Sequence, residues 1–367
     1  MIDLSPSFYA AKEKEMLSFI TETKSCWQAL KEETRPLYIY GMGNGADKIM
    51  AVFEEYGISI KGFFASDEFV RGHSFKGYKV KKYSEVCAEE EDFVIVLAFA
   101  AGYDSLLKKI EGMAAEHTLY APDVPIEGGG LFTYEYCLEH AGEIEKVYNA
   151  LADDLSRKVF ADVINFRISG KTEYLKGVTT PKSEVYTDII CPSGNEVYVD
   201  LGAYTGDTIA ELLEFTDGKY EKIYALEPDR RNFKKLTLST EGMENVEIFN
   251  CAVWDKDTEL MFADRSGRQS AVSTAGKPKE ARSVDSILAG GRADIIKMDV
   301  EGAEDEAING AENTIKTFRP KLMISLYHRN RDIFYLPLKV LGLHPDYKIY
   351  IRHQPYIPAW ETNLYAI

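Results

Sequence analysis

Residues 197–208, VYVDLGAYTGDT, are the feature that most restricts the fold of this chain. The first three residues are a short apolar run of strand type, and the turn that follows contains Gly202 and Gly206. A buried strand, a glycine turn and the start of a helix, in this order, are typical of α/β proteins that hold a nucleotide at the end of a parallel strand. The stretch therefore predicts an α/β fold with a ligand at this turn.

Strand-like and helix-like segments alternate from residue 196 to the end of the chain. The predicted strands are EVYVDLG, KIYALEP, VEIFNCAVW, ADIIKMDVEG, KLMISLYH, YKIYIRH and NLYAI. The last two are separated only by QPYIPAWET, which is too short for a helical crossover, so the last strand is predicted to be antiparallel. We expect a Rossmann-like, seven-stranded sheet over residues 183–367.

A smaller β-α-β alternation precedes this region. PLYIYGMGNGA is a strand that runs into a glycine turn, DKIMAVFEEYG is a helix closed by Gly57, and ISIKGFFASDE, DFVIVLAF and HTLYAP add strands. The stretch PIEGGG at 125–130 is the clearest linker, and 367 residues are enough for two domains. We predict N-terminal helices at 1–35, a small Rossmann-like α/β domain at 36–125, a helical linker at 126–182 and the larger domain at 183–367.

Composition and charge exclude several partners. The formal net charge of −16 argues against a nucleic acid, because non-specific binding to a phosphate backbone needs clustered Lys and Arg. The longest apolar run, FVIVLAFAAG, has the length of a strand and not of a membrane span. The first residues lack the basic start and apolar core of a signal peptide. Five scattered cysteines without a C-x-x-C pair indicate reduced thiols, so we expect a cytoplasmic protein.

The turn at 202–206 does not suit a dinucleotide. That fingerprint is G-x-G-x-x-G, whereas Ala203 and Tyr204 occupy the positions where backbone must approach a pyrophosphate. Asp200 and Asp207 would also repel phosphate at the start of the helix. S-adenosylmethionine carries a sulfonium and an ammonium, which carboxylates attract, and one carboxylate for backbone N–H groups. We therefore predict S-adenosylmethionine as the ligand of this turn.

The ends of the next strands supply further candidate contacts. Glu227 ends KIYALEP, the position from which an acid accepts hydrogen bonds from ribose hydroxyls. Asn250 and Ala252 end the third strand, where an adenine edge is expected. Asp299 and Glu301 follow the fourth strand and reach the same edge of the sheet.

Six segments together resemble the FkbM family of S-adenosylmethionine-dependent methyltransferases: VDLGAYTGDT, ALEPD, NCAVWD, SVDSIL, IIKMDVEGAE and RPKLMISLYH. The resemblance covers residues 183–367. It implies a class I methyltransferase sheet and transfer of a methyl group, usually to a hydroxyl of a sugar, glycan or polyketide. The predicted cofactor site then contains Asp200, Gly202, Ala203, Tyr204, Gly206, Asp207, Thr208, Glu227, Pro228, Asn250, Ala252 and Asp299.

A sugar hydroxyl is a poor nucleophile, so the acceptor needs a base or a metal ion beside it. His328 follows the fifth strand and, with Asp299 and Glu301, is our predicted catalytic group; His353 is a second candidate, better explained as a structural histidine. No metal ligand is assigned. Mg²⁺ is kept as an alternative, because Asp299, Glu301, Glu304 and Asp305 offer oxygen ligands. Glu304 and Asp305 are better explained by the first turn of a helix, where acids stabilise the dipole.

The first glycine turn, GMGNGA at 41–46, is closer to the nucleotide fingerprint than the later turn. It resembles, less specifically, the nucleotide-sugar-binding domain attached to some sugar acetyltransferases. Gly41, Gly43, Asn44 and Asp67 are its candidate ligand residues. We predict a nucleotide or nucleotide-sugar there, with a domain kept only for packing as the alternative.

Three functions remain in competition. The leading one is O-methylation of a sugar, glycan or related small molecule. The second is a nucleotide-binding or nucleotide-sugar-binding protein with a non-catalytic methyltransferase scaffold, which the intact strand-end residues disfavour. The third is an NAD-dependent oxidoreductase, which the short first domain disfavours. Homo-oligomer formation is left open by the sequence.

Overall fold

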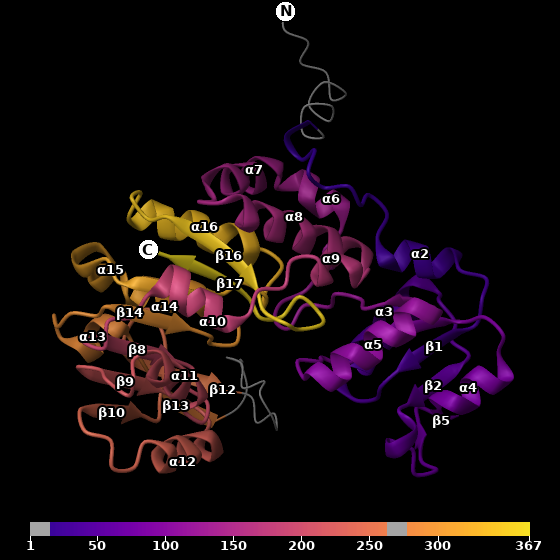
Figure 1. Cartoon of the computed structure of the whole chain (residues 1–367), viewed down its shortest axis with the longest axis horizontal. Coiled ribbons are helices and arrows are strands. Elements are labelled where there is room, and N and C mark those ends of the chain that lie inside the picture. Colours follow the sequence, from indigo (N-terminus) through magenta and orange to yellow (C-terminus); the bar gives the residue numbers. More distant parts are fainter. Residues whose placement is uncertain (1–14, 263–276) are drawn as a thin grey trace, which may run out of the picture.

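The computed structural model describes residues 15–262 and 277–367, which form two lobes (Figure 1). The lobe on the right of Figure 1 contains a five-stranded sheet from residues 37–120, and the lobe on the left a seven-stranded sheet from residues 197–366. Helices from residues 134–176 lie above the junction of the lobes. Two α/β sheets, the larger one Rossmann-like, are the fold class that the sequence predicts.

The smaller sheet is parallel throughout, in the order β5-β2-β1-β6-β7. Two of its strands, β1 and β6, are buried at every residue, as is usual for parallel strands with both faces covered. The elements of this lobe are β1 (Leu37–Tyr40), α3 (Asn44–Tyr56), β2 (Gly62–Ala65), a 3₁₀ turn (Asp67–Phe69), β3 (Ser74–Phe75), β4 (Tyr78–Lys79), β5 (Lys81–Lys82), α4 (Tyr83–Glu89), β6 (Val94–Leu97), α5 (Asp104–Glu116) and β7 (Thr118–Tyr120).

Helices form the connection between the two sheets. The longest of them, α8, begins at Asp153, whose carboxylate accepts a hydrogen bond from the N–H of Ser156, and ends at Gly170 in the left-handed conformation. Helices before and after the smaller sheet are α2 (Cys26–Glu32), α6 (Tyr134–Glu139), α7 (Ala141–Ala150), α8 (Asp154–Ser169), α9 (Glu173–Lys176), α10 (Lys182–Val185) and a π-helical turn (Tyr186–Ile190). Residues 1–14, part of the predicted N-terminal helices, lie outside the described residues.

The larger sheet has the order β10-β9-β8-β14-β15-β17-β16. Its last strand, β17, lies between β15 and β16 and is antiparallel to both, which confirms the prediction made from the short final connection. The strands are β8 (Val197–Leu201), β9 (Lys222–Leu226), β10 (Val246–Phe249), β14 (Ile295–Met298), β15 (Lys321–Ser325), β16 (Ile349–His353) and β17 (Thr362–Ala366). The helices are α11 (Asp207–Phe215), α12 (Arg230–Ser239), α13 (Val284–Leu288), α14 (Glu304–Gly310), α15 (Glu312–Phe318) and α16 (Asp332–Leu343).

The prediction of one strand over VEIFNCAVW is wrong. The chain leaves the large sheet after β10, and β11 (Ala252–Val253) joins a separate sheet with β12 (Thr258–Phe262) and β13 (Lys277–Arg282). Asn250 lies at the break, where its side-chain amide donates to the carbonyls of Glu227 and Pro228. These bonds hold the chain beside the end of β9 and end its pairing with the sheet.

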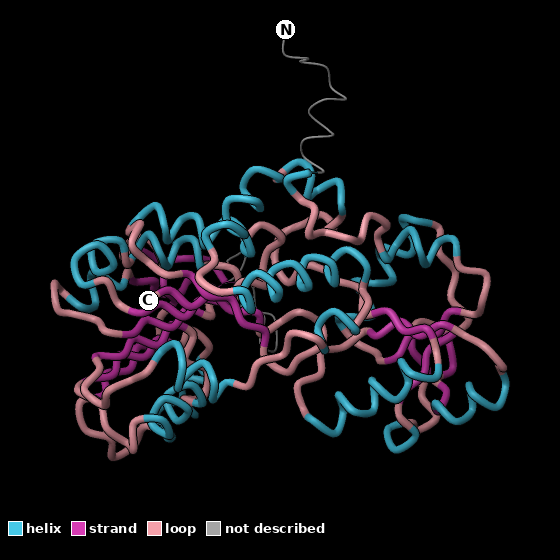
Figure 2. The backbone as a smooth tube through the Cα atoms, turned by 45° about the horizontal axis from the view of Figure 1, so that its top comes forward, coloured by secondary structure: helices cyan, strands magenta, loops and turns pink. Residues whose placement is uncertain are grey.

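The two lobes also meet away from the connecting helices. Ala101, just after β6, exchanges backbone hydrogen bonds of 2.7 and 2.9 Å with Ile357 from the loop between β16 and β17. Arg167 of α8 is buried, forms an ion pair with Asp123 at 2.7 Å and donates to the side chain of Asn330 at 2.8 Å. Figure 2 shows the helices and loops that lie between the two sheets. Among the described residues, no helix is long and apolar enough to span a bilayer.

Candidate active site

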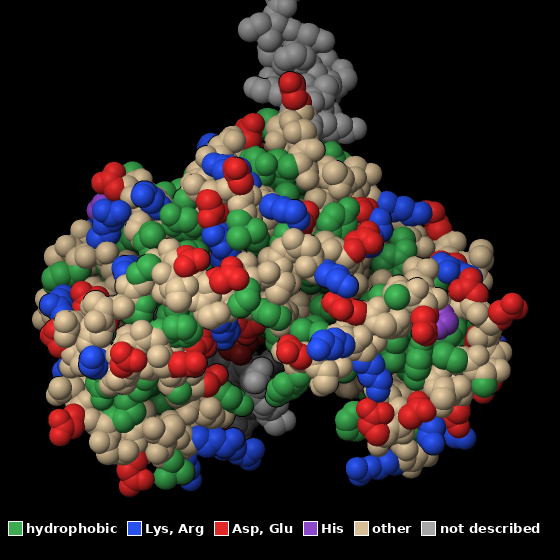
Figure 3. Space-filling view, viewed as in Figure 1, with side chains coloured by type: hydrophobic (Ala, Val, Ile, Leu, Met, Phe, Trp, Pro, Cys, Tyr) green, Lys and Arg blue, Asp and Glu red, His purple; other side chains and the backbone are tan. Residues whose placement is uncertain are grey.

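A cavity of about 340 Å³ lies where β8, β9, β14 and β15 end. Its wall includes Gly202, Glu227, Asp299 and Tyr327, which follow these four strands in turn. The strand order of the sheet reverses between β8 and β14, and open α/β sheets bind ligands at such a switch point. Figure 3 shows a hollow between the two lobes, with acidic side chains along its wall.

The glycine turn after β8 is shaped by close contact with the end of β14. Gly202 has a φ of +79°, and a Cβ placed on it would lie 2.0 Å from the carbonyl oxygen of Asp299. Gly206 has a φ of +88°, and its Cβ would meet the hydroxyl of Ser239 at 2.5 Å. Both positions therefore require glycine, because a side chain would collide and the backbone conformation would be strained. The two glycines hold the backbone of the turn at the floor of the cavity.

Asp200 does not face the cavity, which corrects one premise of the sequence analysis. The residue is fully buried and accepts a hydrogen bond from the hydroxyl of Thr208, while Lys297 Nζ lies 3.2 Å from its carboxylate and donates to the carbonyl of Gly202 at 2.9 Å. Burial raises the pKa of Asp200, and the nearby lysine opposes that shift. The charge that was expected to attract a cationic ligand is therefore neutralised inside the protein.

The lysine partner was missed by the sequence analysis, although a signal was present. Lys297 interrupts the apolar run IIKM, and a lysine inside a buried strand usually has a partner. In the sheet it lies directly across from Asp200, because β14 pairs with β8 in that register. The pair links the glycine turn to the strand that carries Asp299.

Glu227 lies on the cavity wall, and two backbone N–H groups bind its carboxylate. One oxygen accepts the N–H of Tyr204 at 2.9 Å and the other the N–H of Asp229 at 2.7 Å. Burial raises the pKa of Glu227 to about 7, and these hydrogen bonds oppose the shift. Tyr204 has a φ of +47°, unusual for a residue with a side chain, so the turn that holds Glu227 is under backbone strain.

The structure places most of the predicted residues on the cavity wall, but not all. The wall contains Gly202, Tyr204, Asp207, Thr208, Glu227, Pro228, Ala252, Asp299, Glu301 and His328. Asp200, Ala203, Gly206 and Asn250 are not part of this wall and instead support the turn and the end of β9. The prediction that Asn250 contacts an adenine edge is therefore replaced by a supporting role.

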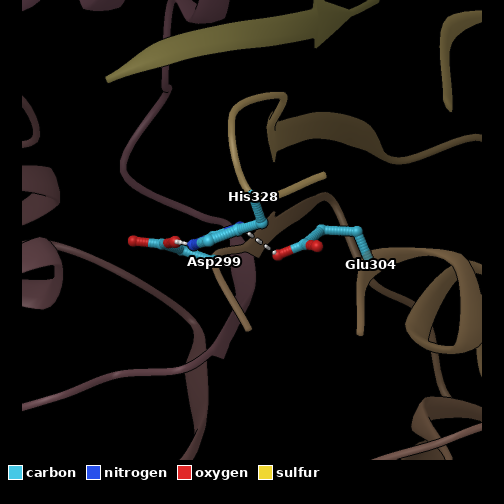
Figure 4. Close-up of side chains that lie close together, drawn as sticks. All are labelled: Asp299, Glu304 and His328. Carbon is cyan, nitrogen blue, oxygen red and sulfur yellow. Dashed lines mark ion pairs between the residues drawn. The ribbon is translucent and has the colours of Figure 1, made fainter. Parts of the chain in front are cut away.

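Three acidic side chains surround His328 at the reaction side of the cavity. Figure 4 shows two of them, Asp299 and Glu304, on opposite sides of the imidazole ring. Its Nε2 lies 3.5 Å from Asp299 and 3.6 Å from Glu301, and its Nδ1 lies 2.9 Å from Glu304. Burial acts to lower the pKa of His328, but the ion pairs with these carboxylates outweigh it and raise the pKa to about 10. An imidazole that carries both protons cannot accept another, so the geometry argues against our prediction that His328 is the base.

Residues 200–356 match the family model described as the methyltransferase FkbM domain. The chain carries an FkbM methyltransferase domain. The protein is accordingly an S-adenosylmethionine-dependent methyltransferase, as the sequence predicted. No match was found among the curated proteins.

One solved structure has a similar fold over almost the whole chain. A crystal structure of methyltransferase FkbM from Methylobacillus flagellatus KT is similar over 99% of this chain and 100% of that one, with 22% identity and a TM-score of 0.70. Fibrillarin from Aeropyrum pernix, solved with S-adenosylmethionine, matches 51% of this chain and 72% of its own at 11% identity, with a TM-score of only 0.34. The first likeness extends through both lobes, so the two-lobed fold is shared with that crystal structure.

Several wall residues of the FkbM domain were not found from the sequence. Lys182 lies in α10 and forms an ion pair with Glu211 at 3.1 Å, and Glu361 comes from the loop before β17. Aromatic side chains also contribute to the wall, among them Tyr327, Tyr356 and Trp360. Lys182, Trp360 and Glu361 do not directly follow a strand, so strand-end reasoning could not identify them, whereas Tyr327 comes just after β15 and could have been found in that way.

His353 is structural in the FkbM fold. It is fully buried in β16, with Nδ1 3.0 Å from the hydroxyl of Thr362 and Nε2 3.0 Å from the carbonyl of Tyr356. Burial lowers the pKa of His353 to about 4. A neutral histidine with both nitrogens engaged is consistent with the structural explanation.

The first glycine turn lies in the other lobe, at the switch point between β1 and β6. Gly41 and Gly43 both have φ above +100°, and a Cβ on Gly43 would meet no described atom within 4 Å. Asn44 begins α3. Asp67 accepts a hydrogen bond from the N–H of Ser84 at 3.2 Å, so its carboxylate is already used by the protein.

Proposed function

We propose that this enzyme transfers the methyl group of S-adenosylmethionine to a hydroxyl of a sugar, glycan or related small molecule. The observation that carries the proposal is the meeting of Glu227, Asp299 and Glu301 in one cavity at the switch point of the methyltransferase sheet. Glu227 is positioned for a nucleoside, and the other two carboxylates stand at the side where an acceptor must enter.

The cofactor would lie along the ends of β8 and β9. Its ribose hydroxyls would donate to Glu227, and its ammonium and sulfonium would lie among the carboxylates of the wall, of which Asp207 belongs to the first turn of α11. Lys182, an exposed residue on the same wall, is suited to the methionyl carboxylate. Charge complementarity of this kind fixes the orientation of a ligand that carries both signs.

The chemical step is an in-line displacement at the methyl carbon. The acceptor oxygen forms a bond to the methyl carbon while the carbon–sulfur bond breaks, and the bonding electrons remain on sulfur as the neutral thioether of S-adenosylhomocysteine. The acceptor proton passes to a carboxylate oxygen of Glu301, which lies beside Asp299 and His328. Glu301 has a φ of +54°, so this residue is held at the cavity in a strained conformation.

A neutral, hydroxylated acceptor suits the wall. Tyr356 and Trp360 lie with ring centroids 6.4 Å apart and an interplanar angle of 26°, which offers an aromatic surface at the cavity mouth. Carboxylates beside aromatic rings accept hydrogen bonds from hydroxyls while the rings pack against C–H groups. A phosphate beside Asp299 and Glu301 would be repelled.

Binding of S-adenosylmethionine should depend on pH through Glu227. Because the pKa of Glu227 is raised to about 7, its carboxylate is protonated below that pH and loses acceptor capacity for the ribose hydroxyls. We expect the dissociation constant to rise by about 10-fold per pH unit below 7, as for any binding that requires the ionised form of one group. Glu227→Ala should raise it about 100-fold at higher pH, two charged hydrogen bonds being lost at ~1.5 kcal/mol each.

Calorimetry with S-adenosylmethionine and S-adenosylhomocysteine tests both expectations. Glu227→Gln should abolish the pH dependence, and Glu244→Gln, an exposed acid in the same domain, should keep wild-type affinity and pH dependence. Unchanged affinity in Glu227→Ala would remove this residue from the cofactor site. Absence of any binding by the wild-type protein would remove the proposed function.

We also propose that the turn after β1 binds a nucleotide or nucleotide-sugar. The open space around Gly43 supports this, as does its place at the switch point of a parallel sheet. Gly43→Val should weaken binding of UDP-sugars or NAD to the full-length protein by more than about 10-fold, because the side chain fills the space where backbone N–H groups meet phosphate.

Two controls and one contrary outcome accompany this test. Gly112→Val places the same side chain in open space on α5 of that lobe and should leave nucleotide affinity unchanged. Affinity for S-adenosylmethionine should not change in either variant. A wild-type protein that ignores all nucleotides at millimolar concentration would show that the turn serves packing alone.

A further inference from the structure

We propose that Asp299, Glu301 and His328 bind a divalent cation at the reaction side of the cavity. A role of this cation in catalysis rests on the proposed function, whereas the cation site itself is inferred from the positions of the three side chains. Asp299 and Glu301 follow β14, and His328 follows β15, and these strands are parallel neighbours. Their carboxyl ends therefore bring two carboxylates and one imidazole to the same point.

The two separations from the imidazole of His328 match those between ligands of one metal ion. Nε2 of His328 lies 3.5 Å from Asp299 Oδ1 and 3.6 Å from Glu301 Oε2, at or beyond the length of a good hydrogen bond. Two ligands bound at about 2.1 Å to one ion lie about 3.0 Å apart in octahedral and about 3.4 Å apart in tetrahedral geometry. Each carboxylate therefore lies at a distance from Nε2 that suits two ligands of one ion.

Glu304 contacts the other nitrogen of His328, Nδ1. Its Oε1 lies 2.9 Å from Nδ1 of His328 and accepts the backbone N–H of Val300 at 3.0 Å. Histidines that bind metals through one nitrogen commonly donate the other N–H to a carboxylate, which fixes the tautomer and the ring orientation. Asp299, Glu304 and His328 also form a group whose candidate ligand atoms all lie within 4.8 Å of one another (Figure 4).

Buried polar atoms in this cluster lack aligned partners. Nδ1 of His328 and Oε2 of Glu304 are both buried and make no hydrogen bond to any described residue, although the ion pair brings the two side chains together. Each residue exposes only 1% of its side chain. Unsatisfied buried groups in a native fold require an explanation, and one is an ion that would draw the ring and the carboxylates into alignment.

The charge of the wall favours a cation as well. Among its described residues are eight carboxylates but only three lysines and arginines. Lys297 is already paired with Asp200, and Arg329 donates to the carbonyl of Gly302 at 2.8 Å. Three carboxylates surround His328, so negative charge is in excess at this point, and a cation that binds Nε2 takes the place of the proton on that nitrogen.

The ligand set indicates the kind of cation. Two carboxylates are the oxygen ligands of Mg²⁺ and Mn²⁺, while an imidazole is uncommon for Mg²⁺ and acceptable to Mn²⁺ and later metals. A Mn²⁺-like ion is therefore the better match than the Mg²⁺ considered from the sequence. Beside the sulfonium, such an ion would bind the acceptor hydroxyl and lower its pKa, and the second oxygen of Glu301 could still take the proton.

Direct Mn²⁺ binding tests the site without an activity assay. We expect the full-length protein, freed of metal by chelation, to bind one Mn²⁺ per chain in calorimetry and electron paramagnetic resonance. Asp299→Asn and His328→Gln should each weaken binding by more than about 100-fold, and Glu304→Gln by about 10- to 100-fold, as for residues that orient a ligand. The exposed controls Asp346→Asn and His73→Gln should bind Mn²⁺ as the wild type does.

The outcomes separate this inference from the proposed function. No Mn²⁺ binding at millimolar concentration, or full binding by both Asp299→Asn and His328→Gln, would overturn the cation site while S-adenosylmethionine binding stands. Mn²⁺ binding without any binding of S-adenosylmethionine would instead remove the methyl-transfer proposal. Because His328 is buried, melting temperatures confirm the fold of its variant, and Asp299, on the cavity wall, provides the second variant.

Discussion

Replacing Glu301 by Gln should lower the turnover number by about 10²–10⁴, the usual contribution of a positioned general base. The substitution keeps size and shape but removes the charge that accepts the proton from the acceptor hydroxyl. Glu301 stands 3.6 Å from His328 on the wall of the cavity, next to Asp299. The rate is measured as release of S-adenosylhomocysteine with an acceptor, found in a panel of sugars and glycans, that the wild-type protein methylates.

Cofactor affinity distinguishes a chemical role from a structural one. In Glu301→Gln the dissociation constant of S-adenosylmethionine should stay within a few-fold of wild type, because Glu227 and the glycine turn are untouched. Glu244→Gln, in an exposed position, should keep full turnover. A Glu301→Gln enzyme with near-normal turnover would show that the proton leaves by another group.

Replacing the buried Lys297 by Met should destabilise the larger domain by about 3–5 kcal/mol. This is the usual cost of leaving one partner of a buried ion pair without the other. Lys297→Met preserves the volume of the side chain but leaves Asp200 fully buried with only the hydroxyl of Thr208. The free energy of unfolding in urea measures the loss.

The same variant should gain stability as the pH falls. Burial already raises the pKa of Asp200, and loss of Lys297 raises it further, so the folded state binds a proton more tightly than the unfolded state. Such a group supports the fold below its unfolded pKa, and that support is lost as the pH rises through its folded pKa. Asp200→Asn combined with Lys297→Met should recover much of the loss, since no charge is then buried. A Lys297→Met protein as stable as wild type would show that Asp200 is satisfied without the lysine.

Much of the site could be predicted because parallel strands end at one edge of a sheet. Gly202, Glu227, Asp299 and His328 come directly after four strands that alternate with helices, and the structure gathers all four on one cavity wall. The antiparallel last strand could also be predicted, since the nine-residue connection QPYIPAWET is too short for a helical crossover. Local sequence patterns are enough wherever the period of a strand or the length of a loop dictates the geometry.

Charge pairing across strands could not be predicted in the same way. From the sequence alone, Asp200 was predicted to attract a cationic cofactor. The register of β14 against β8 places Lys297 directly opposite Asp200, and this lysine neutralises its charge. From the sequence alone, His328 was predicted to be the base. The three carboxylates around it raise its pKa, which argues against that role. The protonation state of a buried group depends on neighbours that are distant in sequence, so it is a tertiary property.

The sequence by itself determined two α/β sheets, the glycine turn that bears the site and the methyltransferase class, because these depend on patterns repeated along the chain. Only the tertiary structure decided that Asp200 is neutralised, that Asn250 supports the end of β9, and that the loop carrying Tyr356 lines the cavity while pairing with the other lobe. The physical reason is that burial, register and loop docking are set by contacts between segments more than a hundred residues apart in some cases, and no local pattern encodes them.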